Sequence, residues 1–300
     1  MIKEEVKIVE VGPRDGLQNE KVILPIETKI ELIDLLVDAG FKTIEPTSFV
    51  RPEYIPQMAD SKTLFSSILK HEDIVFPALV PNKKGFLNSL DAGAKWIAIF
   101  TATSNTFNKK NTNATIDESL KRFDEFVPDA IKEGQTVRGY ISTVFGCPYE
   151  GETSIDEMLR LCEKLISFGV NEISLGDTIG VANPNQVQVI IQRLKEHFDL
   201  SMMAMHFHDT EGMALANILA SYQEGIRIFD SSVAGLGGCP YAKGASGNVA
   251  SDDVINMFHK MNIKTGIDQD KLHKASRFIL KALGKEGSSK FFQANEGRKS

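Results

Sequence analysis

The sequence predicts an α/β protein folded as a (β/α)₈ TIM barrel with an extra C-terminal helix. Short β-rich runs alternate with longer amphipathic segments along the 300 residues, and this alternation is typical of parallel strands joined by crossover helices. About eight such units can be counted, the number that closes a barrel. No linker rich in Ser, Gly or Pro interrupts them. We therefore expect a single domain over residues 1–300, with the barrel at about 5–262 and a helical extension at about 268–300.

Each predicted strand is a short run rich in β-branched and aromatic residues. In chain order the runs are VKIVEVG (6–12), KTIEPTS (42–48), DIVFPALVP (73–81), AKWIAIFTA (94–102), TVRGYISTVFG (136–146), VNEISLGD (170–177), SMMAMHFHD (201–209) and IRIFDSSVAG (226–235).

Between these strands, apolar residues recur every three or four positions, which predicts helices such as 27–40, 116–134 and 154–169. Glycines stand where these and other predicted helices should end: Gly40, Gly93, Gly134, Gly169 and Gly225. After the eighth strand we expect a helix near 252–261 and the extra helix at 268–285, followed by a polar tail that frays.

An open, doubly wound sheet is the competing architecture. Such a sheet normally carries a Gly-rich phosphate-binding turn after its first strand. Here the turn is GPRDGLQNE, which holds charged and amide side chains in place of repeated glycines. The sequence therefore favours the barrel and argues against a dinucleotide-binding protein.

Composition and charge narrow the function further. The chain is 42% hydrophobic with a formal net charge of -6 and no dense basic run. This charge argues against nucleic acid as a ligand, because phosphate binding draws on clustered Lys and Arg. We also expect no membrane span and no signal or transit peptide. The three cysteines are typical of reduced thiols in the cytoplasm, and Cys162 fits a small buried hydrophobe.

In barrels of this kind the active site forms at the C-terminal ends of the strands. Reactive side chains are concentrated there in this sequence, namely Arg14, Asp15, Glu45, Asp177, His206, His208 and Asp209, followed by the segment from Gly235 to Asn248.

The sharpest local pattern is MHFHD, because residues two apart on a strand point the same way. His206 and His208 should therefore both face the barrel mouth and supply half of a metal site. Asp15 and the amide oxygen of Asn248 could complete a mixed nitrogen and oxygen set. This set suits Mg²⁺ or Mn²⁺, although the ligand types are also compatible with zinc.

Two further residues are candidates for the chemistry. Arg14 would place a permanent cation beside the metal, suited to an oxyanion such as a thioester enolate; the structural alternative is an ion pair with Glu45 or Asp177. Cys239 lies in the Gly-rich run AGLGGCPYAKGASGN, which predicts a mobile loop. Its thiol could exchange a proton at the site, or it could be an incidental surface cysteine.

Taken together, GPRDGLQNE, IEPTSFV, KKNTN, GCPYEG, SLGDTIG, HFHDTEG and GLGGCPYAKGASGN resemble the 3-hydroxy-3-methylglutaryl-CoA lyases, from residue 9 to beyond residue 250. The resemblance implies metal ligands at Asp15, His206, His208 and Asn248, and catalytic roles for Arg14, Asp15, Glu45, Asp177, His206 and Cys239. Pro46 departs from the Thr expected after Glu45. The resemblance also suggests a homodimer.

By this resemblance the chain should cleave hydroxymethylglutaryl-CoA to acetyl-CoA and acetoacetate, in leucine breakdown or ketone-body formation. Asp15 or His206 would accept the hydroxyl proton, Arg14 would neutralise the thioester oxygen, and Cys239 would protonate the enolate. Arg14 and Gln18 are also expected to contact the substrate, and Lys109, Lys110 and Asn111 to contact CoA phosphates.

Three alternatives remain open from the sequence. The first is a condensing enzyme of the same superfamily, such as an isopropylmalate or homocitrate synthase, although those chains typically have an additional C-terminal region. The second is an aldolase acting on 4-hydroxy-2-oxo acids. The third, of another class, is an inactive CoA-binding scaffold, which should have lost a metal ligand or Cys239.

Overall fold

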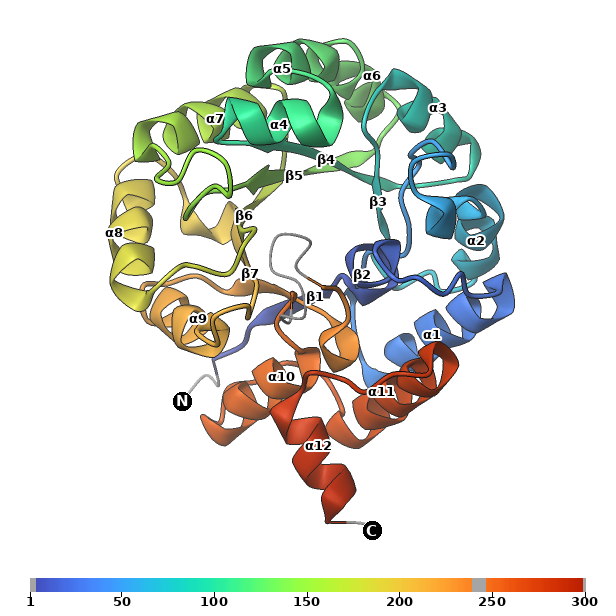
Figure 1. Ribbon diagram of the computed structural model, residues 1–300. Coiled ribbons are helices and arrows are strands. Elements are labelled where there is room, and N and C mark those ends of the chain that lie inside the picture. The colour runs from blue at the N-terminus through green and yellow to red at the C-terminus, as the bar shows by residue number, and fades with distance from the viewer. Residues whose placement is uncertain (1–3, 239–246, 299–300) are drawn as a thin grey trace.

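The structure, a computed structural model, describes residues 4–238 and 247–298. Eight parallel strands form a barrel with helices around it (Figure 1), as the sequence predicts. Each strand lies within one of the eight predicted runs. The strands are β1 (Lys7–Glu10), β2 (Thr43–Ile44), β3 (Pro77–Leu79), β4 (Trp96–Ala102), β5 (Thr136–Ser142), β6 (Glu172–Asp177), β7 (Met203–Phe207) and β8 (Ile228–Ser231).

The strand order shows how the barrel closes. The order is β2-β1-β8-β7-β6-β5-β4-β3, so the first and last strands of the chain are neighbours. The remaining gap between β2 and β3 is bridged by the pairs Thr43–Val75 and Ser48–Leu79. Because all strands run the same way, their C-terminal ends meet at one rim, where the predicted reactive residues lie.

The helices surround this barrel. They are α1 (Ile26–Ala39), α2 (Ser61–Ile68), α3 (Lys83–Asp91), α4 (Asn105–Thr112), α5 (Ile116–Asp124), α6 (Val127–Lys132), α7 (Ile155–Ser167), α8 (Pro184–Lys195), α9 (Ala214–Gln223), α10 (Ser251–Lys260), α11 (Gln269–Leu283) and α12 (Lys290–Gly297). Local sequence explains several ends. Thr115 and Glu118 form a reciprocal capping box at the start of α5, and Gly40 ends α1 in the left-handed region, at φ 106°.

Two predictions about the helices were wrong. The segment 116–134 forms two helices, α5 and α6, because Pro128 in the first turn of α6 has no N–H to continue the earlier helix. The polar tail also contains a helix, α12, where fraying was predicted. The carboxylate of Asp253 accepts the backbone N–H groups of Lys290 and Phe291, which fixes the start of α12.

Side chains along each strand point alternately into and out of the barrel, and the two sets lie in different environments. Outward-facing residues such as Ile97, Ile99 and Val137 pack under the helices in the main hydrophobic core. The inward-facing residues include buried polar and charged groups, among them Arg138, Ser174 and Asp230. The barrel axis therefore holds a polar network, in contrast to the branched apolar filling common in this fold.

Below the rim, Glu10 is a fully buried carboxyl between β1 and α10. Its Oε1 accepts the N–H groups of Gly12 and Val233, both at 2.8 Å, and its Oε2 lies 2.6 Å from Ser251 Oγ. Burial raises the pKa of Glu10 to about 8, and the hydrogen bonds only partly oppose this. At neutral pH the carboxyl is consequently largely protonated in the folded protein.

This buried carboxyl predicts a pH-dependent stability. Between pH 4.5 and 8 the folded chain keeps a proton that the unfolded chain releases, so the free energy of unfolding falls as pH rises through this window. Glu10→Gln should remove up to about 1.4 kcal/mol per pH unit of this slope. Urea denaturation at several pH values measures it. An unchanged slope in Glu10→Gln would contradict the prediction.

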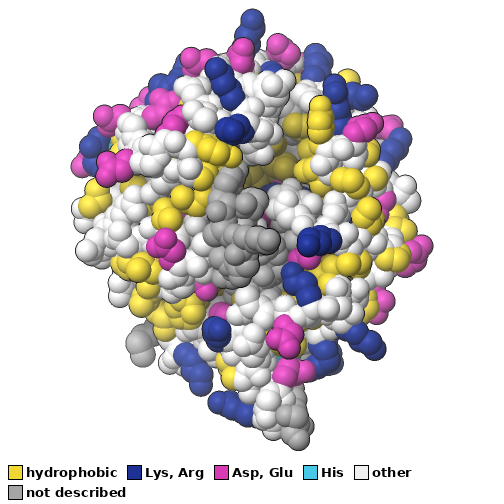
Figure 2. Space-filling view, in the orientation of Figure 1, with side chains coloured by type: hydrophobic (Ala, Val, Ile, Leu, Met, Phe, Trp, Pro, Cys, Tyr) yellow, Lys and Arg dark blue, Asp and Glu magenta, His cyan; other side chains and the backbone are white. Residues whose placement is uncertain are grey.

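The face of the molecule shown in Figure 2 carries Lys and Arg interspersed with Asp and Glu, and its coloured side chains form no continuous patch of one sign. Within residues 4–238 and 247–298, no helix has both the length and the apolar character needed to cross a bilayer.

Candidate metal centre and active site

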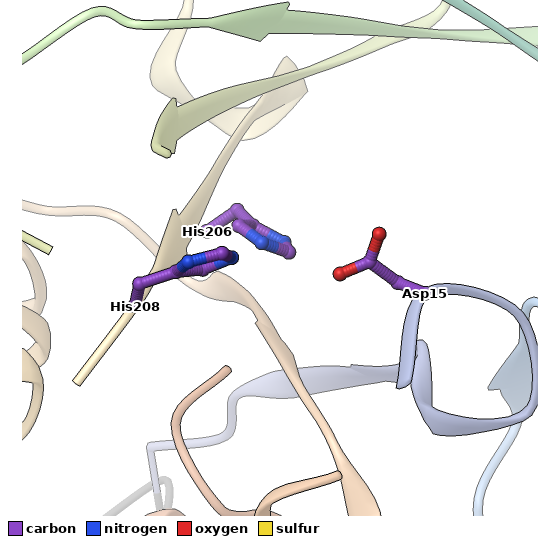
Figure 3. A group of neighbouring side chains, drawn as sticks. All are labelled: Asp15, His206 and His208. Atoms are coloured by element: carbon purple, nitrogen blue, oxygen red, sulfur yellow. The ribbon is translucent and has the colours of Figure 1, made fainter. Parts of the chain in front are cut away.

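Two histidines on one strand point at a carboxylate from the other side of the barrel mouth (Figure 3). His206 lies on β7 and His208 directly follows it, and their ring centroids are 5.3 Å apart. Ligand atoms of His206, His208 and Asp15 all lie within 4.8 Å of one another. The predicted convergence of these three residues is therefore present.

Asp15 reaches this position through the turn η1 (Gly12–Gly16), which follows β1. Its backbone N–H bonds Val11 O at 2.7 Å, which turns the chain sharply at the end of the strand. A side chain at Gly16 would place its Cβ 2.8 Å from the Cβ of Leu236, so only glycine allows this close approach.

The carboxylate of Asp15 accepts hydrogen bonds from three side chains of the described residues. Arg14 Nη1 and Gln18 Nε2 donate to Oδ1 at 2.5 and 2.9 Å, and Asn248 Nδ2 donates to Oδ2 at 2.8 Å. Burial alone would raise the pKa of Asp15, but Arg14, His206 and His208 hold it below its usual range. Asp15 is thus an anion at neutral pH. The predicted substrate-binding residue Gln18 contacts this carboxylate, and Asn248 presents its amide nitrogen to Asp15.

The two histidines differ electrostatically. His206 Nδ1 lies 3.3 Å from Asp230 Oδ2, and this carboxylate raises the pKa of His206 despite burial. If Nδ1 of His206 carries the proton and donates it to Asp230, the lone pair of Nε2 is available to a cation. Burial, with His206 nearby, lowers the pKa of His208 to about 4, and its buried Nδ1 has no hydrogen-bond partner among the described residues. His208 therefore offers a neutral imidazole.

Sequence reasoning missed the buried ion network beneath this site. Arg138, fully buried on β5, donates to Asp230 Oδ1 at 2.7 Å, to Glu172 Oε1 at 2.6 Å and to Tyr140 Oη at 2.5 Å. Arg138 holds the pKa of Asp230 well below its usual range, with His206 adding to the effect. A signal was available, because Arg138 and Tyr140 stand two apart within a predicted strand and so share its inward face.

Glu45 lies at the end of β2, as predicted, and it holds Arg14. Arg14 Nε and Nη2 lie 2.8 and 2.6 Å from Glu45 Oε2, and Tyr140 Oη donates to the same oxygen at 3.2 Å. Arg14 therefore forms the ion pair with Glu45 and also lies beside Asp15. The two alternatives that the sequence offered for Arg14 are both present in the structure. Burial raises the pKa of Glu45, with Arg14 opposing it.

Asp177 ends β6 with its carboxylate turned to the following loop. It accepts the N–H groups of Val181 and Ala182 at 3.1 and 3.0 Å. Burial raises its pKa to about 6, although these hydrogen bonds partly oppose the shift. Its backbone carbonyl accepts the N–H of His208 at 3.4 Å, so Asp177 also contacts the histidine-bearing segment.

The remaining candidates divide by location. Lys109, Lys110 and Asn111 are exposed on α4, with Lys110 Nζ 4.8 Å from the ring centroid of Tyr149. Cys162 is fully buried in α7, as predicted, and burial raises the pKa of its thiol to about 12. Cys239 lies outside the described residues.

The residues present fit a divalent cation. One carboxylate oxygen and two imidazoles converge here, and the buried Nδ1 of His208 is a polar atom with no hydrogen-bond partner within residues 4–238 and 247–298. A hard or borderline cation such as Mg²⁺, Mn²⁺ or Zn²⁺ accepts this donor set.

Comparison with known proteins places the chain in a family. The family model described as HMGL-like matches residues 5–279. A Bos taurus relative named "Hydroxymethylglutaryl-CoA lyase, mitochondrial" is 50% identical over 97% of this chain and 90% of its own length. A hydroxymethylglutaryl-CoA lyase structure from Pseudomonas aeruginosa shares 45% identity and a TM-score of 0.96, covering 99% of each chain. An Acinetobacter baumannii HMG-CoA lyase in complex with coenzyme A and 3-methylmalate shares 38% identity and a TM-score of 0.93, covering 98% of this chain and 96% of that one. The chain belongs to the HMGL-like family.

Proposed function

We propose that this protein is a carbon–carbon lyase that cleaves 3-hydroxy-3-methylglutaryl-CoA to acetyl-CoA and acetoacetate. The observation that carries the proposal is the convergence of Asp15, His206 and His208 beside the guanidinium of Arg14. The names of relatives at up to 50% identity over nearly the whole chain support the same reaction.

The cation belongs to this proposal. Asp15, His206 and His208 would hold it, with the amide oxygen of Asn248 as the fourth protein ligand, and Mg²⁺ or Mn²⁺ is the metal we propose. When bound, the cation supplies positive charge that lowers the pKa of a coordinated substrate hydroxyl.

The chain's own residues perform the proton transfers. Asp15 or His206 accepts the proton of the tertiary hydroxyl, and the new carbonyl forms as the adjacent carbon–carbon bond breaks. The electron pair of that bond moves into the thioester as an enolate. Cys239 donates its proton to the enolate carbon, giving acetyl-CoA, while the other fragment leaves as acetoacetate.

The guanidinium of Arg14 is held in a fixed position where it can bind the thioester oxygen of the substrate. Three of its nitrogens are already engaged by the carboxylates of Asp15 and Glu45. Each terminal nitrogen carries two hydrogens, so one hydrogen on each remains for an oxyanion. Because the guanidinium is held before substrate arrives, it stabilises the developing charge without reorganising.

The CoA arm completes the substrate. We propose that it lies across the rim near α4, where Lys109, Lys110 and Asn111 are available to its phosphates, while Arg14 and Gln18 approach the acyl group. The Acinetobacter relative was solved with coenzyme A, which supports CoA as a ligand class. A homodimer and a cytoplasmic location stay predictions, and the bovine relative is named mitochondrial.

The test is turnover of hydroxymethylglutaryl-CoA by the purified protein with Mg²⁺ or Mn²⁺. We expect equal amounts of acetyl-CoA and acetoacetate, loss of activity after chelation, and recovery when the cation is restored. Product formation that does not respond to chelation would contradict the metal assignment. Activity confined to oxo-acid cleavage or condensation would favour the aldolase or synthase alternatives, and CoA binding without turnover would favour the scaffold.

A further inference from the structure

The turn that follows β8 holds an alanine in a backbone conformation that alanine does not favour. In the turn η4 (Val233–Gly235), Ala234 has φ 56° and Gly235 has φ 67°. The left-handed region is costly for alanine, and such residues persist only where the surroundings fix them. Part of the surroundings here comes from the C-terminal extension.

Three hydrogen bonds hold this turn, one from α10 and two from the C-terminal extension. Asp252 Oδ2, in the first turn of α10, accepts the N–H of Ala234 at 3.0 Å. Ser288 N donates to Ala234 O at 3.2 Å, and Ser288 Oγ donates to Gly235 O at 3.3 Å. Gly287 approaches so closely that a Cβ there would lie 2.9 Å from Ala234 O.

The segment that makes the last two contacts, residues 285–289, lies between α11 and α12 (Figure 1). Side-chain contacts anchor it at both ends. Lys285 pairs with Glu20, which follows the turn bearing Asp15. Ser289 Oγ donates to Asp253 Oδ1 at 2.8 Å on α10. We call residues 285–289 the C-terminal clamp.

Hydrogen bonds connect this turn to the candidate metal centre. Leu236, directly after it, accepts Asn248 Nδ2 at its carbonyl at 3.2 Å, and Gly237 O accepts the N–H of Gly247 at 3.1 Å. Asn248 also contacts Asp15. A shift of the turn would therefore be transmitted to Asn248 through its side chain and its backbone neighbour.

We infer that the C-terminal clamp positions Asn248 for cation binding by holding Ala234 and Gly235 in their left-handed conformation. Gly287 and Ser288 are positioning residues that touch neither substrate nor cation. The inference deepens the proposed function and rests on its metal site.

Gly287→Ala tests the inference, because the added methyl must displace Ala234 O or the clamp. We expect the dissociation constant for Mn²⁺, measured by electron paramagnetic resonance of the free ion, to rise about tenfold, the usual effect of losing a contact that orients a ligand. With hydroxymethylglutaryl-CoA, kcat should fall and KM should change less than twofold. Ser288→Ala, which removes only the bond to Gly235 O, should raise the Mn²⁺ dissociation constant by a smaller factor.

Gly297→Ala is the matched control. It lies in the same extension, and a Cβ there meets nothing within 4 Å, so Mn²⁺ affinity and kcat should stay at wild-type values. Wild-type Mn²⁺ affinity in both Gly287→Ala and Ser288→Ala, even with a lowered melting temperature, overturns the inference, as does an equal loss in Gly297→Ala. A wild-type protein that binds Mn²⁺ but does not cleave the substrate refutes the proposed reaction and leaves this test standing; one that binds no Mn²⁺ refutes both.

Discussion

Replacing Asp15 with alanine should lower kcat for hydroxymethylglutaryl-CoA cleavage by about 10³-fold, the upper range for losing one electrostatic contact to developing charge. The carboxylate is the anionic member of the metal-ligand group and also holds Arg14, Gln18 and Asn248. Its removal therefore weakens cation binding and releases the guanidinium at the same time. Steady-state assays at saturating Mg²⁺ measure the fall in kcat, and Mn²⁺ binding measures the weakened cation affinity independently of turnover.

Asp199→Asn provides the comparison for Asp15→Ala. Asp199 is exposed and precedes β7, and its carboxylate accepts the N–H of Ser201 at 2.9 Å, a bond that an asparagine oxygen can also accept. We expect activity within about threefold of wild type, since the local hydrogen bond is preserved. An Asp15→Ala variant that keeps a tenth or more of wild-type kcat would remove the basis for the proposed centre.

Arg138→Met should destabilise the fold by about 3–5 kcal/mol, the range for removing one partner of a buried ion pair. The change leaves Asp230 and Glu172 without the cation that faces both of them inside the barrel. Asp230 would then lose the charge that holds its pKa low, and His206 would lose a fixed hydrogen-bond partner. Urea denaturation measures the stability, and Mn²⁺ affinity reports the effect on His206.

A surface arginine provides the control for this prediction. Arg160 pairs with Glu157 on α7, with 40% of its side chain exposed, so Arg160→Met should cost less than about 1 kcal/mol. The double variant Arg138→Met/Asp230→Asn should be more stable than Arg138→Met alone, because it removes the buried charge of Asp230 that Arg138 neutralised. Glu172 keeps its ion pair with Lys7 at 2.8 Å in both variants. Equal stability losses for Arg138→Met and Arg160→Met would show that the network contributes little.

Local sequence patterns were sufficient to predict the fold and part of the site. The alternation of strand and helix patterns predicted the barrel, because the hydrophobic period of each unit can be read from a short stretch of sequence. Eight consecutive units of this kind are typical of a closed parallel barrel. The two-residue spacing of His206 and His208 was enough to place both on one face. The amphipathic pattern runs across Pro128 without interruption and so predicted one helix, but proline cannot continue a helix and the structure has two.

The tertiary structure decided which long-range partners set the chemistry. From the sequence alone came the strand-end positions of Arg14, Asp15, Glu45 and both histidines, because strand direction and side-chain alternation are local properties. Only the fold shows that Arg138 and Asp230, 92 residues apart, meet in the barrel axis behind His206. Likewise, only the fold shows that Ser288 contacts Ala234 and Gly235. Such contacts depend on how strands and the C-terminal extension pack in three dimensions, and no local period in the chain encodes them.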